Sequence, residues 1–229
     1  MNDGSSDVGE LFHFTVQDGV SVSARLALPR RARACYVLAH GAGAGMTHPF
    51  MSVTARELAS LGIASLRYQF PYMERRLRRP DPPALCHATV RAAVAEAARR
   101  AAPLPLIAGG RSFGGRMTSQ AQALEPLAGV RGLAFLGFPL HPAGRPSDAR
   151  AQHLEQVKIP LLFLQGTRDA LADNTRMAAL VARLGARATL SPVEDADHSF
   201  RVPARCGRTD AQVRMALVRT LAVWMDGLL

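Results

Sequence analysis

Apolar residues along the chain fall into short continuous runs that are separated by stretches with helical spacing. Residues 11–29, LFHFTVQDGVSVSARLALP, alternate apolar and polar positions on both sides of Asp18-Gly19, a pair that favours a tight hairpin turn. This segment therefore predicts two antiparallel strands. Continuous apolar runs predict further, buried strands at 34–40, 63–70, 104–110, 130–140, 159–166 and 186–194.

Helical spacing fills most of the intervals between these runs. In residues 49–61 every third or fourth residue is apolar, and Gly62 is a typical helix stop. The same spacing predicts helices at 86–97, 113–124, 177–184 and 213–228. Strands that alternate with helices predict an α/β fold, in which an antiparallel N-terminal hairpin joins a mostly parallel central sheet with helices on both faces. The connection 141–157 is too short for a large lid, so we expect an open site.

The length of 229 residues suits one α/β domain with a large core, and no repeat, low-complexity segment or linker divides it. The N-terminus MNDGSSDVGE is polar, without the basic and apolar segments of a secretory signal. No apolar run approaches the roughly 20 residues that span a bilayer. We therefore expect a single cytoplasmic domain over 1–229 that has no membrane contact and whose residues 1–10 are flexible.

The net charge of +10 does not by itself predict a nucleic-acid partner. Lys158 is the only lysine among 28 basic residues, and the arginines are scattered along a chain with only 6% aromatic residues. A nucleic-acid surface usually concentrates its charge and interleaves it with aromatic side chains. The cluster Arg75, Arg76, Arg78 and Arg79 is more typical of a solvated loop than of an anion site, although it follows a strand and could lie near the mouth of a site.

The cysteines Cys35, Cys86 and Cys206 have neither CxxC nor metal-ligand spacing. Reduced thiols in packed positions are the expected state, and no His/Cys cluster predicts a zinc site. The sequence therefore predicts no metal and no cofactor.

The segment AGGRSFGGRM (108–117) contains the pattern G-x-S-x-G, with Ser112 at its centre. An apolar run precedes it and a helical stretch follows it, as a nucleophile elbow requires. In such an elbow the small residues two before and two after the serine allow neighbouring chains to approach closely. Ser112 is therefore a candidate nucleophile, whereas a plain strand-to-helix glycine turn is the alternative.

A serine hydroxyl needs a base, and the base needs an acid to orient it. Asp169 in QGTRDA and His198 in DADHSF follow two later strands, in the chain order serine, acid, histidine. We favour these two as acid and base. Asp173 is the alternative acid, because Asp169 could instead cap the next helix, and His141 is the competing histidine, although it precedes both acids.

The loop AHGAGAGM (39–46) follows the third strand and is rich in small residues, so its backbone N–H groups can face a ligand. For an oxyanion hole we expect the N–H groups of Phe113 and Ala42, with Gly41 as an alternative donor. A phosphate-binding loop is disfavoured, because the chain lacks the lysine and spacing that such loops use. His40 is expected to support the loop, and Arg111 and Arg116 to brace loops beside the elbow.

Together, HGAGAGM, GGRSFGG, QGTRDA and DADHSF resemble the α/β-hydrolase superfamily, near its small dienelactone hydrolase-like members, from about residue 20 to the C-terminus. The segments YQFPYMERR, GGRSFGGRM and GFPLHPAGRP are similar to a narrower group of bacterial proteins related to testis-expressed protein 30 and to the hydrolase-like domain of NSL-complex subunit 3. Dienelactone hydrolases proper use a cysteine where this chain has Ser112, and haloalkane dehalogenases use an aspartate, so neither activity is implied.

The resemblance implies an α/β-hydrolase fold and a carboxylesterase-like serine hydrolase that acts on a small-molecule ester or thioester through Ser112, His198 and Asp169. A catalytically idle domain used for protein interaction is one alternative, and a peptidase or acyltransferase with the same triad is another. The sequence does not define the acyl chain, the leaving group or the oligomeric state.

Overall fold

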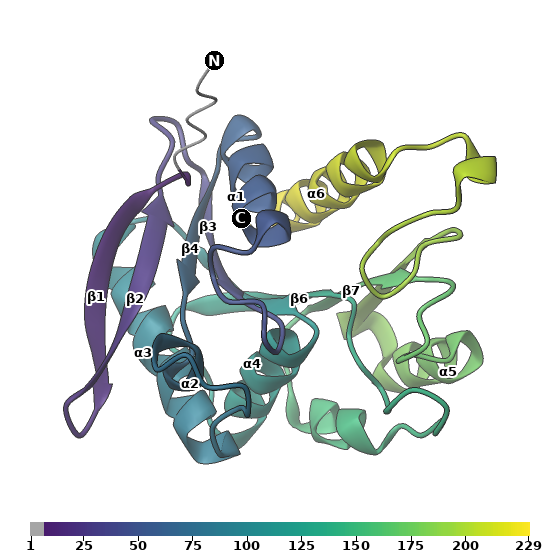
Figure 1. Ribbon diagram of the computed structural model, residues 1–229, viewed down its shortest axis with the longest axis horizontal. Coiled ribbons are helices and arrows are strands. Elements are labelled where there is room, and N and C mark those ends of the chain that lie inside the picture. Colours follow the sequence, from purple (N-terminus) through teal and green to yellow (C-terminus); the bar gives the residue numbers. More distant parts are fainter. Residues whose placement is uncertain (1–6) are drawn as a thin grey trace.

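The computed structural model describes residues 7–229, whose strands form one eight-stranded sheet (Figure 1). The strands lie in the order β1-β2-β4-β3-β5-β6-β7-β8, and every pair from β4 to β8 is parallel. Only the pairs β1/β2 and β2/β4 are antiparallel. The strand bounds are β1 (Glu10–Gln17), β2 (Val20–Ala27), β3 (Ala34–Ala39), β4 (Ile63–Tyr68), β5 (Leu106–Arg111), β6 (Val130–Leu136), β7 (Leu161–Gly166) and β8 (Ala188–Val193).

The N-terminal hairpin confirms the expected turn. Asp18 and Gly19, which connect β1 to β2, both have positive φ angles, 46° and 75°. A two-residue turn with this geometry matches the twist of antiparallel strands, and aspartate and glycine tolerate it better than most residues. The local sequence therefore specifies where the first two strands turn.

Helices cover both faces of the sheet, and each face has its own apolar core. On one face pack α1 (Pro49–Ser60) and α6 (Asp210–Asp226), which contribute Met51 and Leu221 to the core. On the other face lie α3 (Pro83–Arg100), α4 (Phe113–Leu124) and α5 (Asn174–Leu184), with Val90, Met117 and Leu180 buried. The predicted α/β architecture is confirmed.

Shorter helices occupy the connections. The segment between β6 and β7 contains the 3₁₀ helix η1 (Ala149–Gln156), and no long lid is present in the described part of the chain. Single turns form η2 (Gly185–Arg187), η3 (Ala204–Cys206) and α2 (Pro71–Glu74). The apolar pattern did not predict α2, because one helical turn is too short to show a period.

The structure describes the N-terminal segment, which we expected to be flexible over residues 1–10, from Asp7 onwards. Residues 1–6 lie outside the described residues. The carboxylate of Asp7, however, pairs with the buried guanidinium of Arg67, at 2.9 Å between Oδ1 and Nη1, and β1 begins at Glu10. A buried arginine requires such partners, so it holds this end of the chain against β4.

Within residues 7–229, no helix combines the length and the apolar character that crossing a membrane would take. The three cysteines are free thiols, as expected. Cys35 and Cys86 are buried, and burial raises the pKa of each thiol to about 12. Both are therefore protonated, unreactive core residues at neutral pH.

Candidate active site

Ser112 lies between the end of β5 and the start of α4, with φ 48° and ψ −116°. A residue with a side chain rarely adopts this conformation, so the turn is strained. Two backbone hydrogen bonds hold it. Ser112 N donates to Leu136 O on β6 at 3.2 Å, and Arg116 N in α4 donates to Ser112 O at 3.1 Å. The strand–serine–helix geometry predicted for the elbow is present.

Two glycines allow β3, β5 and α4 to approach one another at this turn. A side chain on Gly110 would overlap the carbonyl of Ala39, and one on Gly114 would overlap the carbonyl of His40. Both contacts are with backbone, which cannot move aside cheaply. The small residues two before and two after Ser112 are therefore a steric requirement of the elbow.

Ser112, His198 and Asp169 form a continuous hydrogen-bonded chain. The distance from Ser112 Oγ to His198 Nε2 is 2.8 Å, and that from His198 Nδ1 to Asp169 Oδ2 is 2.6 Å. With Nδ1 donating to the carboxylate, Nε2 is left free to accept the serine proton. The three residues come from the turns after β5, β7 and β8, at the carboxyl ends of parallel strands, where open α/β sheets assemble their sites.

The Asp169 carboxylate is buried and fully hydrogen-bonded. Besides His198, Oδ2 accepts from Gln165 Nε2 at 2.6 Å, and Oδ1 accepts from the backbone N–H of Leu171 at 2.8 Å. Gln165 in turn accepts from Phe138 N at 2.9 Å, which ties this network to the segment after β6. Because its other acceptor positions are satisfied, the carboxylate has a single orientation towards the imidazole.

The alternative acid and histidine have other partners. Asp173 is the N-cap of α5, where its Oδ1 accepts from Arg176 N at 2.9 Å. The buried His141 accepts from the backbone N–H of Asp173 at 3.0 Å and donates to the carbonyl of Pro142. The structure therefore brings Asp169 and His198 to Ser112, and it places Asp173 and His141 in the support of α5.

Two of the expected oxyanion donors, Gly41 and Phe113, lie beside Ser112. A side chain on Gly41 would lie within 3.8 Å of Ser112 Cβ, so the loop after β3 passes next to the serine. Phe113 is the first residue of α4. Among the described residues, the N–H groups of Gly41, Ala42 and Phe113 donate to no protein acceptor. Free N–H groups near the serine are what an oxyanion requires.

The segment after β4 holds this loop in place, a contribution that the sequence reasoning missed. Gly43 N donates to Tyr72 Oη at 3.0 Å, and Met46 N donates to Gln69 Oε1 at 2.9 Å. The Tyr72 ring is buried and packs edge-on against Phe113. Gln69 and Tyr72 lie in YQFPYMERR, but only the structure shows that their polar atoms reach the glycine-rich loop.

His40 holds the start of the glycine-rich loop in place through two hydrogen bonds, as expected. Its Nε2 accepts from Phe70 N at 3.1 Å, and its Nδ1 donates to Gly41 O at 2.8 Å. Burial lowers the pKa of His40 from 6.5 to about 4, and the Gly41 carbonyl offsets this effect only in part. His40 is therefore neutral at pH 7.

We predict that this buried histidine makes the fold sensitive to mild acid. The pKa of His40 is lower when folded than when unfolded, so the unfolded state binds the extra proton first. Stability is therefore lost as the pH falls below about 6.5, by about 2 kcal/mol between pH 7 and pH 5. Urea unfolding at several pH values measures the slope of the unfolding free energy against pH. His40→Gln should flatten it relative to His13→Gln on the exposed hairpin. Equal slopes in the two variants would contradict the assignment.

Arg111 and Arg116 lie against loops and rings beside the elbow, as expected. Arg111 Nη2 donates to Ser199 Oγ at 3.1 Å, and its guanidinium carbon lies 4.5 Å from the centre of the Phe50 ring. Arg116 lies 5.9 Å from the centre of the Phe113 ring. Arg111 therefore joins the elbow to the His198 loop and to α1.

The four arginines between residues 75 and 79 are exposed. Arg75 pairs with Asp81, whose other oxygen accepts from Tyr72 N at 2.6 Å. This pairing supports the expectation of a solvated loop and gives Arg75 a structural partner.

Comparison with known proteins identifies relatives of the whole fold. A family model described as "Alpha/beta hydrolase domain" matches residues 32–226. A structure of an alpha-beta serine hydrolase homologue from Coxiella burnetii superposes with a TM-score of 0.74 and 18% identity, covering 93% of this chain and 98% of that one.

Two further solved structures are similar to this chain to about the same degree. A serine hydrolase without lid from Xanthomonas campestris gives a TM-score of 0.71 and 20% identity, over 97% of this chain and 98% of its own. A dienelactone hydrolase from Anabaena variabilis gives a TM-score of 0.72 and 20% identity, over 96% of this chain and 99% of its own. At these identities the likeness establishes the fold.

Proposed function

We propose that this chain, which belongs to the alpha/beta hydrolase domain family, is a carboxylesterase-like serine hydrolase that cleaves an ester or thioester through an acyl-enzyme intermediate. The observation that carries the proposal is the pair of short hydrogen bonds that joins Ser112 Oγ through His198 to the buried Asp169 carboxylate. In this arrangement the imidazole accepts the proton of the serine hydroxyl, which makes the serine oxygen nucleophilic.

In the first half-reaction, Ser112 Oγ attacks the carbonyl carbon of the substrate and its proton passes to His198 Nε2. The Asp169 carboxylate stabilises the imidazolium that forms. As the tetrahedral intermediate collapses, the bond from carbon to the leaving oxygen or sulfur breaks. The proton on Nε2 then passes to the leaving group, which departs as an alcohol or thiol.

In the second half-reaction, a water molecule takes the place of the leaving group. His198 accepts a proton from the water, the hydroxide attacks the acyl carbon, and the bond to Ser112 Oγ breaks. The serine recovers its proton from Nε2. The sum is one ester or thioester and one water converted to one acid and one alcohol or thiol.

The negative charge on the carbonyl oxygen requires donors in both half-reactions. We assign this role to the backbone N–H groups of Phe113 and Ala42, with Gly41 as the alternative to Ala42. Their freedom from protein acceptors and the position of the loop beside Ser112 support the assignment. The contacts from Tyr72 and Gln69 keep the loop in this position.

The extent of the catalytic domain, its location in the cell and its partners are part of the same proposal. We propose that residues 1–229 act as one catalytic domain in the cytoplasm, on a small-molecule substrate and without a nucleic-acid partner. The resemblance of YQFPYMERR and GFPLHPAGRP to the group around testis-expressed protein 30 and NSL-complex subunit 3 remains a prediction from those motifs.

A fluorophosphonate probe tests the proposal directly. The purified protein should gain one covalent adduct, at Ser112 by peptide mass spectrometry, because the probe reacts with an activated serine and mimics the tetrahedral intermediate. The same preparation should hydrolyse short 4-nitrophenyl esters. A folded protein that neither reacts with the probe nor hydrolyses any ester would support the idle-domain alternative instead. Preferential cleavage of peptides, or transfer to an added alcohol, would indicate a peptidase or an acyltransferase.

A further inference from the structure

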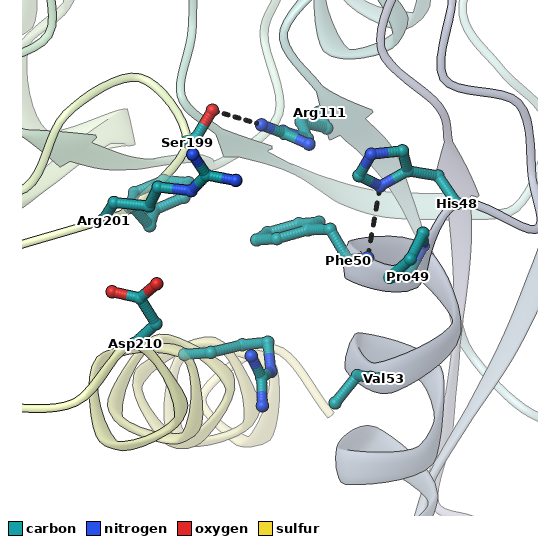
Figure 2. Close-up of a pocket in the computed structure, with 10 residues that line it drawn as sticks. His48, Pro49, Phe50, Val53, Arg111, Ser199, Arg201 and Asp210 are labelled. Atoms are coloured by element: carbon teal, nitrogen blue, oxygen red, sulfur yellow. Dashed lines mark hydrogen bonds between the residues drawn. The ribbon is translucent and has the colours of Figure 1, made fainter.

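A pocket with a volume of about 260 Å³ lies between α1, α6 and the loop after His198 (Figure 2). Two of its lining residues, Arg111 and Ser199, are the chain neighbours of Ser112 and His198. Its other walls come from the start of α1, the start of α6 and the loop after His198. The pocket is therefore a candidate for holding the part of a substrate that extends away from Ser112.

The pocket has more basic than acidic side chains. Arg111 and Arg201 both line it, and within residues 7–229 neither has a carboxylate within 4.0 Å. The third arginine, Arg214, is paired with Glu57 at 3.0 Å. The one carboxylate in the lining, Asp210, lies on α6 across the pocket from Arg111 (Figure 2).

The carboxylate of Asp197, whose charge acts on Arg111 although it does not line the pocket, accepts hydrogen bonds from the backbone. Its Oδ1 accepts from Ser199 N at 2.7 Å and from Arg201 N at 2.9 Å, which shapes the loop after His198. Arg111 is half-buried, which lowers the pKa of its guanidinium, whereas the charges of Asp197 and Asp169 act in the opposite direction. A half-buried cation without a carboxylate in direct contact is incompletely compensated, and a bound anion would supply that contact.

The remaining lining supplies an apolar wall and one more polar group. Phe50 stacks on Phe200 with 6.1 Å between ring centres, and the Arg111 guanidinium lies over the Phe50 ring. His48 Nδ1 accepts from Phe50 N at 3.2 Å, which leaves the proton on Nε2. Burial and the charge of Arg111 both lower the pKa of His48, so the ring is neutral at pH 7.

We propose that this pocket is the specificity site of the hydrolase and that it selects esters or thioesters carrying a negatively charged group, which binds Arg111 and Arg201. The inference rests on the proposed function and adds the substrate class. Arg111 is the main determinant, because Ser199 and the Phe50 ring fix its guanidinium next to the elbow. Arg201 adds charge at the solvent side, and the two phenylalanines contact the carbon chain that links the anion to the ester.

Pairs of esters matched in length test the charge preference on each side of the scissile bond. On the acyl side, mono-4-nitrophenyl glutarate is compared with 4-nitrophenyl pentanoate. On the alcohol side, 4-carboxyphenyl butanoate is compared with phenyl butanoate. In at least one pair, kcat/KM should be higher for the charged ester by about tenfold or more, and the preference should shrink at high salt as the charges are screened.

Variants assign the preference to the pocket. Arg111→Gln should reduce kcat/KM for the charged ester at least about tenfold more than for its neutral partner, and Arg201→Gln should do so to a smaller extent. Arg205→Gln is the matched control, because it removes one exposed arginine from the same loop outside the pocket. The proposal would be overturned if the wild type had equal kcat/KM for charged and neutral esters. It would also be overturned if Arg111→Gln lowered kcat/KM equally for both.

Binding to Ser112→Ala separates this proposal from the proposed function. Calorimetry on that variant should show tighter binding of a charged ester than of its neutral partner, and the difference should disappear in the double variant Ser112→Ala/Arg111→Gln. If the wild type neither reacts with a fluorophosphonate nor hydrolyses any ester, the proposed function fails while this measurement still decides the anion site. Equal affinities for charged and neutral esters reject the anion site alone.

Discussion

Replacing Ser112 with alanine is expected to lower kcat/KM for short 4-nitrophenyl esters by a factor on the order of 10⁴ to 10⁶. The substitution removes one oxygen atom, and with it both the nucleophile and the partner of His198 Nε2. The residual rate comes from the oxyanion donors and from substrate binding alone. Ser112→Ala should also give no fluorophosphonate adduct. Circular dichroism and thermal unfolding check that the fold is retained.

A second serine–histidine pair, between α4 and η1, provides a matched control. Ser119 Oγ lies 2.8 Å from His153 Nε2, the same distance as in the candidate site, but it donates its proton to the carbonyl of Arg116. No carboxylate of the described residues is bonded to His153. Ser119→Ala should therefore keep activity within about twofold of the wild type. A loss of activity in Ser119→Ala as large as in Ser112→Ala would show that the wrong serine has been assigned.

Asp169→Asn is expected to lower kcat by a factor on the order of 10⁴. Asparagine has almost the same shape, and its carbonyl oxygen can still accept from Leu171 N. With that oxygen facing Leu171, however, its NH₂ group replaces the acceptor of both His198 Nδ1 and Gln165 Nε2. The imidazole then carries its proton on Nε2 and cannot accept the serine proton. Steady-state kinetics on 4-nitrophenyl esters measure the loss.

Asp173→Asn is the control for this prediction, because Asp173 was the alternative acid. Asparagine caps a helix about as well as aspartate, so stability should change by less than about 1 kcal/mol. Activity should stay close to that of the wild type. If Asp173→Asn is the more damaging of the two variants, the acid has been misassigned.

The fold was predictable because its signals are local and repeated. Asp18-Gly19 specifies the hairpin turn, continuous apolar runs mark the buried strands, and Gly62 follows the end of α1. Each of these features depends on residues within one turn or one strand. The single turn of α2 and the ordering of Asp7 were not predictable in this way, since α2 has no period and Asp7 is held by Arg67, 60 residues later in the chain.

The candidate catalytic residues were predictable because their chain order and their positions after strands are visible in one sequence. The choice between Asp169 and Asp173 was predicted only as a preference for Asp169, with Asp173 as the alternative. It depends on which carboxylate faces the imidazole and which one caps α5, a difference that arises from the packing of the turn after β7. The same limit applies to Tyr72 and to the Arg111 pocket, whose members come from distant segments and have no shared pattern.

The short connection between β6 and β7 has a kinetic consequence. With only the 3₁₀ helix η1 in that interval and no long lid in the described part of the chain, nothing there encloses the acyl group after the alcohol has left. An enzyme that transfers acyl groups must keep water away from this intermediate long enough for a second acceptor to arrive. If the chain is the hydrolase proposed above, we expect bulk water to reach the acyl carbon first, so that the intermediate partitions towards release of a free acid.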